Sequence, residues 1–106
     1  MKFLSLVVIV FSSISALGAP PPQAATCIAC HGADGNPAVA TYPVLAGKSE
    51  EFIISQLEKF EKGEIKSVTV MNSMVAAVKD PAAKKAVAKF YASQKCKARC
   101  NEAPKK

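Results

Sequence analysis

Three stretches of the chain carry apolar residues in patterns that predict structure. The first, from Phe3 to Phe11, is interrupted only by Ser5. The other two, residues 50–62 and 81–94, repeat apolar residues at intervals of three and four, which predicts helices with one buried face. The chain shows no strand hairpin signal and no internal repeat, so the pattern predicts an all-α fold.

The first of these helices has clear start and stop signals. Ser49 is a suitable N-cap, and Glu50 and Glu51 lie in the first turn, where the helix dipole favours negative charge. The helix is expected to run to Lys62 and stop at Gly63. Its inner face is expected to consist of Ile53, Leu57 and Phe60.

The second helix is predicted to begin with Asp80 as N-cap and Pro81 as first residue, and to continue to about Gln94. Between the two helices, residues 68–75 are rich in β-branched side chains, and a loop is expected there. The inner stripe of the second helix is expected to consist of Ala83, Val87, Phe90, Tyr91 and Gln94.

The N-terminal apolar run reads as an export signal. It follows Lys2 and precedes small residues, with a suitable cleavage site at Gly18 or Ala19. The run is shorter than the about 20 residues of a stable membrane anchor, although an uncleaved anchor is an alternative. We therefore predict a signal peptide over residues 1–19, one domain over residues 20–106, location in the periplasm, and no membrane span after cleavage.

The chain is basic, with 14 Lys and Arg against 8 Asp and Glu. This excess can be a solvated helix face, or it can attract a redox partner with an acidic docking patch. Nucleic acid is not expected as a partner, because aromatic and basic residues do not interleave. Many of the cations follow residue 78: Lys79, Lys84, Lys85, Lys89, Lys95, Lys97, Arg99, Lys105 and Lys106.

The segment Cys27-Ile28-Ala29-Cys30-His31 has the spacing of a c-type haem attachment site. Each thiol can form a thioether to one vinyl group of the same porphyrin, and the adjacent imidazole can ligate the iron. A redox disulfide is an alternative, although the flanking residues lack its usual βαβ context. Another alternative is a four-thiolate zinc site with Cys96 and Cys100.

The sixth iron ligand has few candidates. His31 is the only histidine, so two histidines from one chain cannot ligate the iron. Met71 and Met74 are the remaining soft ligands, because Met1 leaves with the signal peptide. Either methionine could instead fill an apolar gap.

An ordered series of motifs resembles the bacterial class I cytochromes c, in particular the cytochrome c-553 group and single halves of the dihaem c4 type. The resemblance implies an all-α fold around one covalent haem c, with His31 and Met71 as axial ligands, Met74 being the alternative to Met71. It also implies that the Pro43 carbonyl lies near His31 and fixes its ring. The motifs are residues 27–36, 42–47, 71–75 and 90–94, with Gln56, Leu57, Phe60 and Gly63.

Two features depart from that family. Only residues 20–26 of the predicted mature chain precede Cys27, so the N-terminal helix is expected to be shortened. Cys96 and Cys100 have no following histidine and cannot attach a second haem. In an exported protein they are expected to form a local disulfide, with free thiols or an intermolecular bridge as alternatives. Since the helical i,i+4 spacing is too wide for this bond, the helix should fray or turn by Cys100.

The function expected from these features is one-electron transport without chemistry on a substrate, so the chain is not expected to be an enzyme. One alternative is the haem-bearing subunit of a periplasmic dehydrogenase complex. Another is a gas-binding haem protein with an open sixth site.

Overall fold

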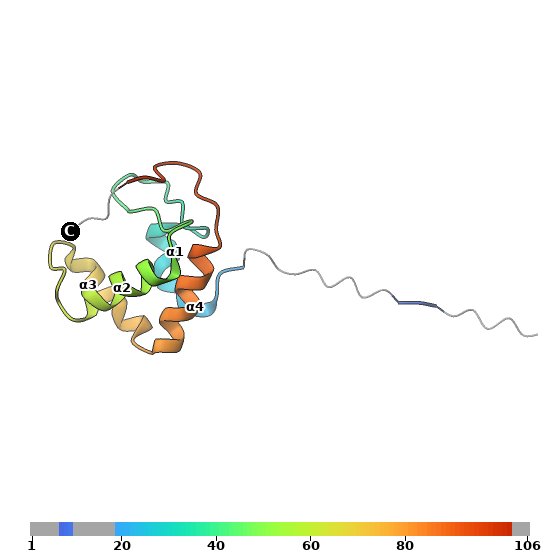
Figure 1. The fold of residues 1–106 in the computed structure, drawn as a ribbon, viewed down its shortest axis with the longest axis horizontal. Coiled ribbons are helices and arrows are strands. Elements are labelled where there is room, and N and C mark those ends of the chain that lie inside the picture. The colour runs from blue at the N-terminus through green and yellow to red at the C-terminus, as the bar shows by residue number, and fades with distance from the viewer. Residues whose placement is uncertain (1–6, 10–18, 103–106) are drawn as a thin grey trace, which may run out of the picture.

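The structure, a computed structural model, describes residues 7–9 and 19–102 (Figure 1). Most of the predicted signal peptide, with the cleavage position at Gly18, lies outside these ranges, whereas residues 7–9 and the alternative cleavage position at Ala19 lie within them. The described part is helical and contains no strand, which confirms the predicted all-α class. Its elements are η1 (Pro22–Ala24), α1 (Ala25–His31), α2 (Glu50–Glu61), α3 (Thr69–Met74), η2 (Val75–Val78) and α4 (Pro81–Ala92), where η denotes a 3₁₀ helix.

The helices α2 and α4 begin at the predicted caps. The hydroxyl of Ser49 accepts a hydrogen bond from the Phe52 N–H at 3.1 Å, and the Asp80 carboxylate accepts one from the Ala82 N–H at 2.9 Å. Each of these bonds satisfies an amide that has no partner within its helix. After α2 the backbone turns at Gly63, with φ of 74°. α4 ends at Ala92, two residues before the predicted end.

The core forms where α2 packs against α4. Ile53 and Leu57 of α2 are buried against α4, as their spacing predicts. On α4, Tyr91 is fully buried, and its ring meets that of Phe90 edge-on at 5.0 Å between centroids. Burying a large apolar side chain contributes about 1.5–3 kcal/mol. The remaining core residues include Ala24, Val75, Val78, Val87 and Ala88.

The loop expected over residues 68–75 is wrong, because this segment forms α3 and the start of η2. The Asn72 amide donates hydrogen bonds to the carbonyls of Phe60 and Ile65, at 2.8 and 3.0 Å, which ties α3 to the end of α2. Val75 and Val78 of η2 are buried in the core. Tertiary packing therefore outweighs the low helix propensity of the β-branched residues.

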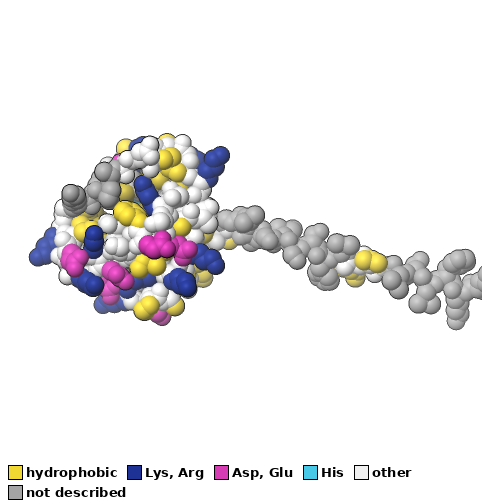
Figure 2. Space-filling model, in the orientation of Figure 1, with side chains coloured by type: hydrophobic (Ala, Val, Ile, Leu, Met, Phe, Trp, Pro, Cys, Tyr) yellow, Lys and Arg dark blue, Asp and Glu magenta, His cyan; other side chains and the backbone are white. Residues whose placement is uncertain are grey.

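Lys84 does not belong to the exposed basic surface expected from the sequence. It is only 6% exposed, and its ammonium lies 2.6 Å from Glu61 Oε2 and 2.8 Å from the Lys79 carbonyl oxygen. On the face drawn in Figure 2, basic and acidic side chains are interspersed. The exposed lysines from residue 79 onward are Lys79, Lys85, Lys89, Lys95 and Lys97, while Lys105 and Lys106 lie outside the described residues.

The irregular segment 32–48 folds back on itself beside α4. The Gly35 carbonyl accepts hydrogen bonds from the Leu45 and Ala46 N–H groups, at 2.9 and 3.1 Å. Gly35 has φ of 78°, and a Cβ there would lie 2.6 Å from Ala46 N and 2.8 Å from a ring carbon of Tyr91. This position therefore requires glycine.

The segment after α4 runs along the 32–48 segment (Figure 1). The Asn36 side chain joins the two, donating to the Lys95 carbonyl at 2.9 Å and accepting from the Lys97 N–H at 2.8 Å. Cys96 and Cys100 form a disulfide, with their Cα atoms 5.8 Å apart, as predicted. The helix has already ended at Ala92, so the bond closes a turn.

The part of the chain that the structure describes contains no helix with the length and apolar composition needed to cross a bilayer.

Candidate haem site

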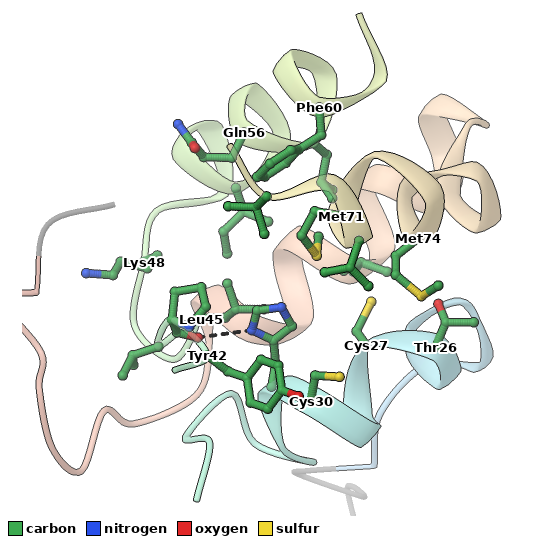
Figure 3. A pocket seen from close by; sticks show the side chains of 18 of the residues that line it. Thr26, Cys27, Cys30, Tyr42, Leu45, Lys48, Gln56, Phe60, Met71 and Met74 are labelled. Atoms are coloured by element: carbon green, nitrogen blue, oxygen red, sulfur yellow. Dashed lines mark hydrogen bonds between the residues drawn. The ribbon is translucent and has the colours of Figure 1, made fainter. Parts of the chain in front are cut away.

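A cavity of about 340 Å³ lies between α1, residues 41–48, α2 and α3 (Figure 3). Its volume falls within the range of about 300–1,000 Å³ typical of small-molecule and cofactor sites. Its walls are mainly apolar, which suits a flat hydrophobic cofactor. The apolar lining includes Val44, Leu45, Phe52, Ile53, Leu57, Phe60, Val68, Val70 and Val87.

Helix α1 brings the residues of the haem attachment signature to one side of the cavity. Cys27, Cys30 and His31 occupy positions i, i+3 and i+4, which share one face of a helix. Both cysteines are free thiols, are half-buried, and point toward the cavity (Figure 3). Burial raises the pKa of the Cys27 thiol, which keeps it protonated at neutral pH. Two unpaired thiols are thus available for bond formation.

The His31 ring is held by the carbonyl of Pro43. His31 is 5% exposed, and its Nδ1 lies 3.0 Å from the Pro43 oxygen, shown by the dashed line in Figure 3. A carbonyl can only accept a hydrogen bond, so Nδ1 carries the proton and Nε2 keeps its lone pair for a metal. Burial lowers the pKa of the imidazole, with the Pro43 bond opposing, and the ring stays neutral. The contact implied by the resemblance is confirmed.

The two methionines of α3 lie differently around the cavity. The Met71 side chain points inward from the side opposite Cys27 and Cys30, whereas Met74 lies at the edge beside Thr26 (Figure 3). Met74 is also 40% exposed. A thioether can ligate the iron of a haem in this cavity only if its side chain reaches into the cavity. The geometry therefore favours Met71 over Met74.

The alternative of a four-thiolate zinc site is wrong. Cys96 and Cys100 are joined to each other, so their thiolates are not available to a metal. Within residues 7–9 and 19–102, no three His, Cys, Asp or Glu side chains are grouped so that they could hold a metal ion. Cys27 and Cys30 are the only free thiols in the described part of the chain, so no second pair is available to complete a four-thiolate site.

Further polar residues line the cavity, among them Tyr42, Lys48 and Gln56, which were not predicted as site residues. Tyr42 lies beside Cys30, and a hydrogen bond between their side chains raises the pKa of the phenol (Figure 3). Lys48 is the single basic residue of the lining, and Gln56 adds an amide. Tyr42 and Gln56 belong to the motifs that resemble the class I cytochromes c, whereas no motif marks Lys48.

Comparison with known proteins shows the family of the chain. No family model matches the chain. The chain is, however, 32% identical over 71 residues to cytochrome c-554(548) of Halomonas halodenitrificans, and the match covers 65% of this chain and 84% of the relative. The chain belongs to the bacterial class I c-type cytochromes. Membership implies that this cytochrome binds haem c covalently.

Two longer proteins are also similar to this class I cytochrome. It is 44% identical over 79 residues to the thiosulfate dehydrogenase electron acceptor of Thiomonas intermedia, a match covering 73% of this chain. It is 36% identical over 73 residues to cytochrome c4 of Pseudomonas aeruginosa, covering 69% of this chain. Each match covers 35% of the relative, so the chain spans about a third of the length of these proteins.

The chemistry of the donor set fits a c-type haem. Two thiols, an imidazole nitrogen with its lone pair free and a thioether converge on one apolar cavity. These are the groups that haem c uses for covalent attachment and axial ligation.

Proposed function

We propose that this cytochrome is a periplasmic one-electron carrier that holds one haem c in the cavity. Residues 1–19 would direct export, and residues 20–106 would form the mature monohaem domain. The observation that carries the proposal is the convergence of Cys27, Cys30 and His31 from α1, with Met71 from α3, on one apolar space. When bound, the haem supplies an iron that gains and loses a single electron.

Each residue has a separate role in this proposal. Cys27 and Cys30 form the two thioethers, His31 ligates through Nε2, and Met71 ligates from the other side. The Pro43 carbonyl holds the imidazole proton on Nδ1 and fixes the ring.

The lining also explains why the chain would carry electrons and not act on a substrate. If His31 and Met71 both ligate the iron, no position is left for a substrate, and the mainly apolar lining would disfavour water. Soft thioether ligation favours the ferrous state and so raises the potential. The proposed role is therefore transfer between partner proteins, and not catalysis.

The test is a spectrum and a mass of the purified protein. We expect one haem per chain that stays attached after denaturation, and a weak sulfur-to-iron band near the red end of the oxidised spectrum. The reduced spectrum should not change with carbon monoxide. A haem that extraction removes would contradict covalent attachment, and a missing sulfur band with carbon monoxide binding would support the open-site gas-binding alternative.

A second candidate is a subunit role in a periplasmic dehydrogenase complex. The name of the Thiomonas relative, a thiosulfate dehydrogenase electron acceptor, favours this candidate. Purification from the native cells under mild conditions distinguishes the two roles. A carrier should elute alone, whereas a subunit should co-elute with a flavin-containing or other catalytic chain.

A further inference from the structure

The turn closed by Cys96 and Cys100 places the guanidinium of Arg99 against the segment that leads to Pro43. Arg99 Nη1 donates to the carbonyls of Ala40 and Tyr42, at 2.9 and 3.3 Å, and Nη2 donates to the Tyr42 carbonyl at 3.3 Å. One side chain thus contacts two carbonyls at positions 57 to 59 residues earlier in the chain.

Three further observations indicate that Arg99 is held in place against the Ala40 and Tyr42 carbonyls. Nη1 also pairs with Glu102 Oε2 at 2.9 Å, and the Lys48 ammonium donates to the Cys100 carbonyl at 3.1 Å. Arg99 has φ of 57°, the left-handed region that costs energy for a residue with a Cβ. The disulfide keeps the turn in that conformation. A strained residue stabilised from several sides indicates that its side-chain position matters.

The path from Arg99 to His31 is short. The hydrogen bonds to the Tyr42 carbonyl fix the plane of the Tyr42–Pro43 peptide, and the pyrrolidine ring fixes φ of Pro43. Only ψ of Pro43 then remains to orient its carbonyl, which accepts from His31 Nδ1. A guanidinium that holds the peptide plane therefore also holds the acceptor of the imidazole proton.

We infer that Arg99, held by the Cys96–Cys100 turn, is a positioning residue for the His31 ligand and thereby tunes the potential of the haem. The inference rests on the proposed function. A firm bond from Nδ1–H to a carbonyl makes the imidazole a better electron donor, which stabilises ferric iron and lowers the potential. Releasing the Pro43 carbonyl should therefore raise the potential.

The sign of the shift separates positioning from charge. Removing a positive charge near the iron stabilises the ferric state, which has one more positive charge, and lowers the potential. Releasing the Pro43 carbonyl raises the potential, so the two effects have opposite signs. Arg99→Ala is therefore expected to raise the midpoint potential, whereas the matched control Lys95→Ala, which removes an exposed charge from the same segment, should leave it unchanged or lower it.

The experiment measures two quantities on the intact holoprotein: the midpoint potential, and the solvent exchange rate of the His31 Nδ1 proton by NMR of the reduced state. For Arg99→Ala we expect a higher potential and an exchange several-fold faster, with the Leu57 amide in α2 exchanging at its wild-type rate. Cys96→Ser with Cys100→Ser should shift both quantities in the same direction. Arg99→Lys should restore them in part.

If either quantity stays at its wild-type value in Arg99→Ala, or if the potential falls, the inference is overturned. If Arg99→Ala yields no folded holoprotein, Arg99→Lys serves as the test. It keeps the charge and loses the two-nitrogen contact, so unchanged values would overturn the inference. Failure of the proposed function is distinguishable, because the wild-type spectrum would then lack a covalent haem or the sulfur band.

Discussion

The Lys84 ammonium lies 2.6 Å from Glu61 Oε2 and joins the first part of α4 to the last residue of α2. The two partners differ in exposure, since the Lys84 side chain is 8% exposed and that of Glu61 is 32% exposed. The cation therefore depends on protein groups for the contacts that water would otherwise supply. Removing the Glu61 carboxylate alone should therefore lower the free energy of unfolding more than removing the Lys84 charge from the pair.

We expect Glu61→Gln to lower the free energy of unfolding by about 1–3 kcal/mol, because it leaves a buried charge without its counter-ion. Lys84→Met removes the charge itself and should be within about 1 kcal/mol of wild type. Denaturant unfolding of the oxidised holoprotein measures both. A larger cost for Lys84→Met than for Glu61→Gln would contradict this interpretation of the pair.

Covalent attachment is tested at the two thiols of α1. The double variant Cys27→Ala, Cys30→Ala should show no haem staining on a denaturing gel and little mature protein, because the core depends on the bound group. Each single variant should retain at most one thioether. Normal staining in the double variant would eliminate the assignment of this motif.

Single substitutions distinguish Met71 from Met74 as the sixth ligand of the iron. Met71→Ala should lose the sulfur-to-iron band and lower the potential, because its thioether points into the cavity. Met74→Ala should keep the band and cost less than the about 2–5 kcal/mol of a buried truncation, since Met74 is 40% exposed. The converse pattern would identify Met74 as the ligand.

Partner docking is expected to depend on exposed lysines of α4. The rate of electron transfer to an acidic partner should fall as salt shortens the Debye length below about 10 Å. Lys85→Glu with Lys89→Glu should flatten this dependence, and Lys84 is excluded because it is buried. The control Lys59→Glu with Lys62→Glu makes the same charge change at the C-terminal end of α2, where Lys62 is the C-cap. Equal effects of the two pairs would indicate a net-charge effect without a docking site.

The ion pair between Asp34 and Lys97 predicts a pH dependence. The Lys97 ammonium, 2.9 Å from Asp34 Oδ2, lowers the pKa of the carboxyl below its ordinary value of 3.8. A lowered folded pKa stabilises the fold above that ordinary value, and this contribution is lost as the pH falls through the folded pKa. Lys97→Ala should therefore lose less stability than wild type as the pH falls below the ordinary carboxyl pKa of 3.8. Denaturant unfolding at a series of acidic pH values measures the stability of both proteins. If the two stabilities fall in parallel as the pH falls, the prediction is contradicted.

Features set by neighbouring residues could be predicted from the sequence. Ser49 and Asp80 cap helices through amides two or three residues away, so their roles are visible in a short window. The spacing of Cys27, Cys30 and His31 likewise requires only a helical turn to bring them together.

Features set by distant residues could not be predicted. α3 forms because Asn72 reaches the end of α2 and because Val75 and Val78 enter the core, and neither contact is visible in the β-branched sequence. Lys84 looks like any surface lysine until α2 brings Glu61 beside it. Long-range contacts of this kind outweigh local propensity.

Gly35 has a consequence for the speed of electron exchange. Its backbone packs against Ala46 and the Tyr91 ring too closely for any side chain, so the 32–48 segment is tightly packed against α4. That segment carries the Pro43 oxygen to which the His31 ring is bonded. We expect an imidazole held in this way to keep the same orientation in both oxidation states, since preorganised groups need no rearrangement at the moment of reaction. An iron ligated as proposed would then change its charge with little movement of the atoms around it.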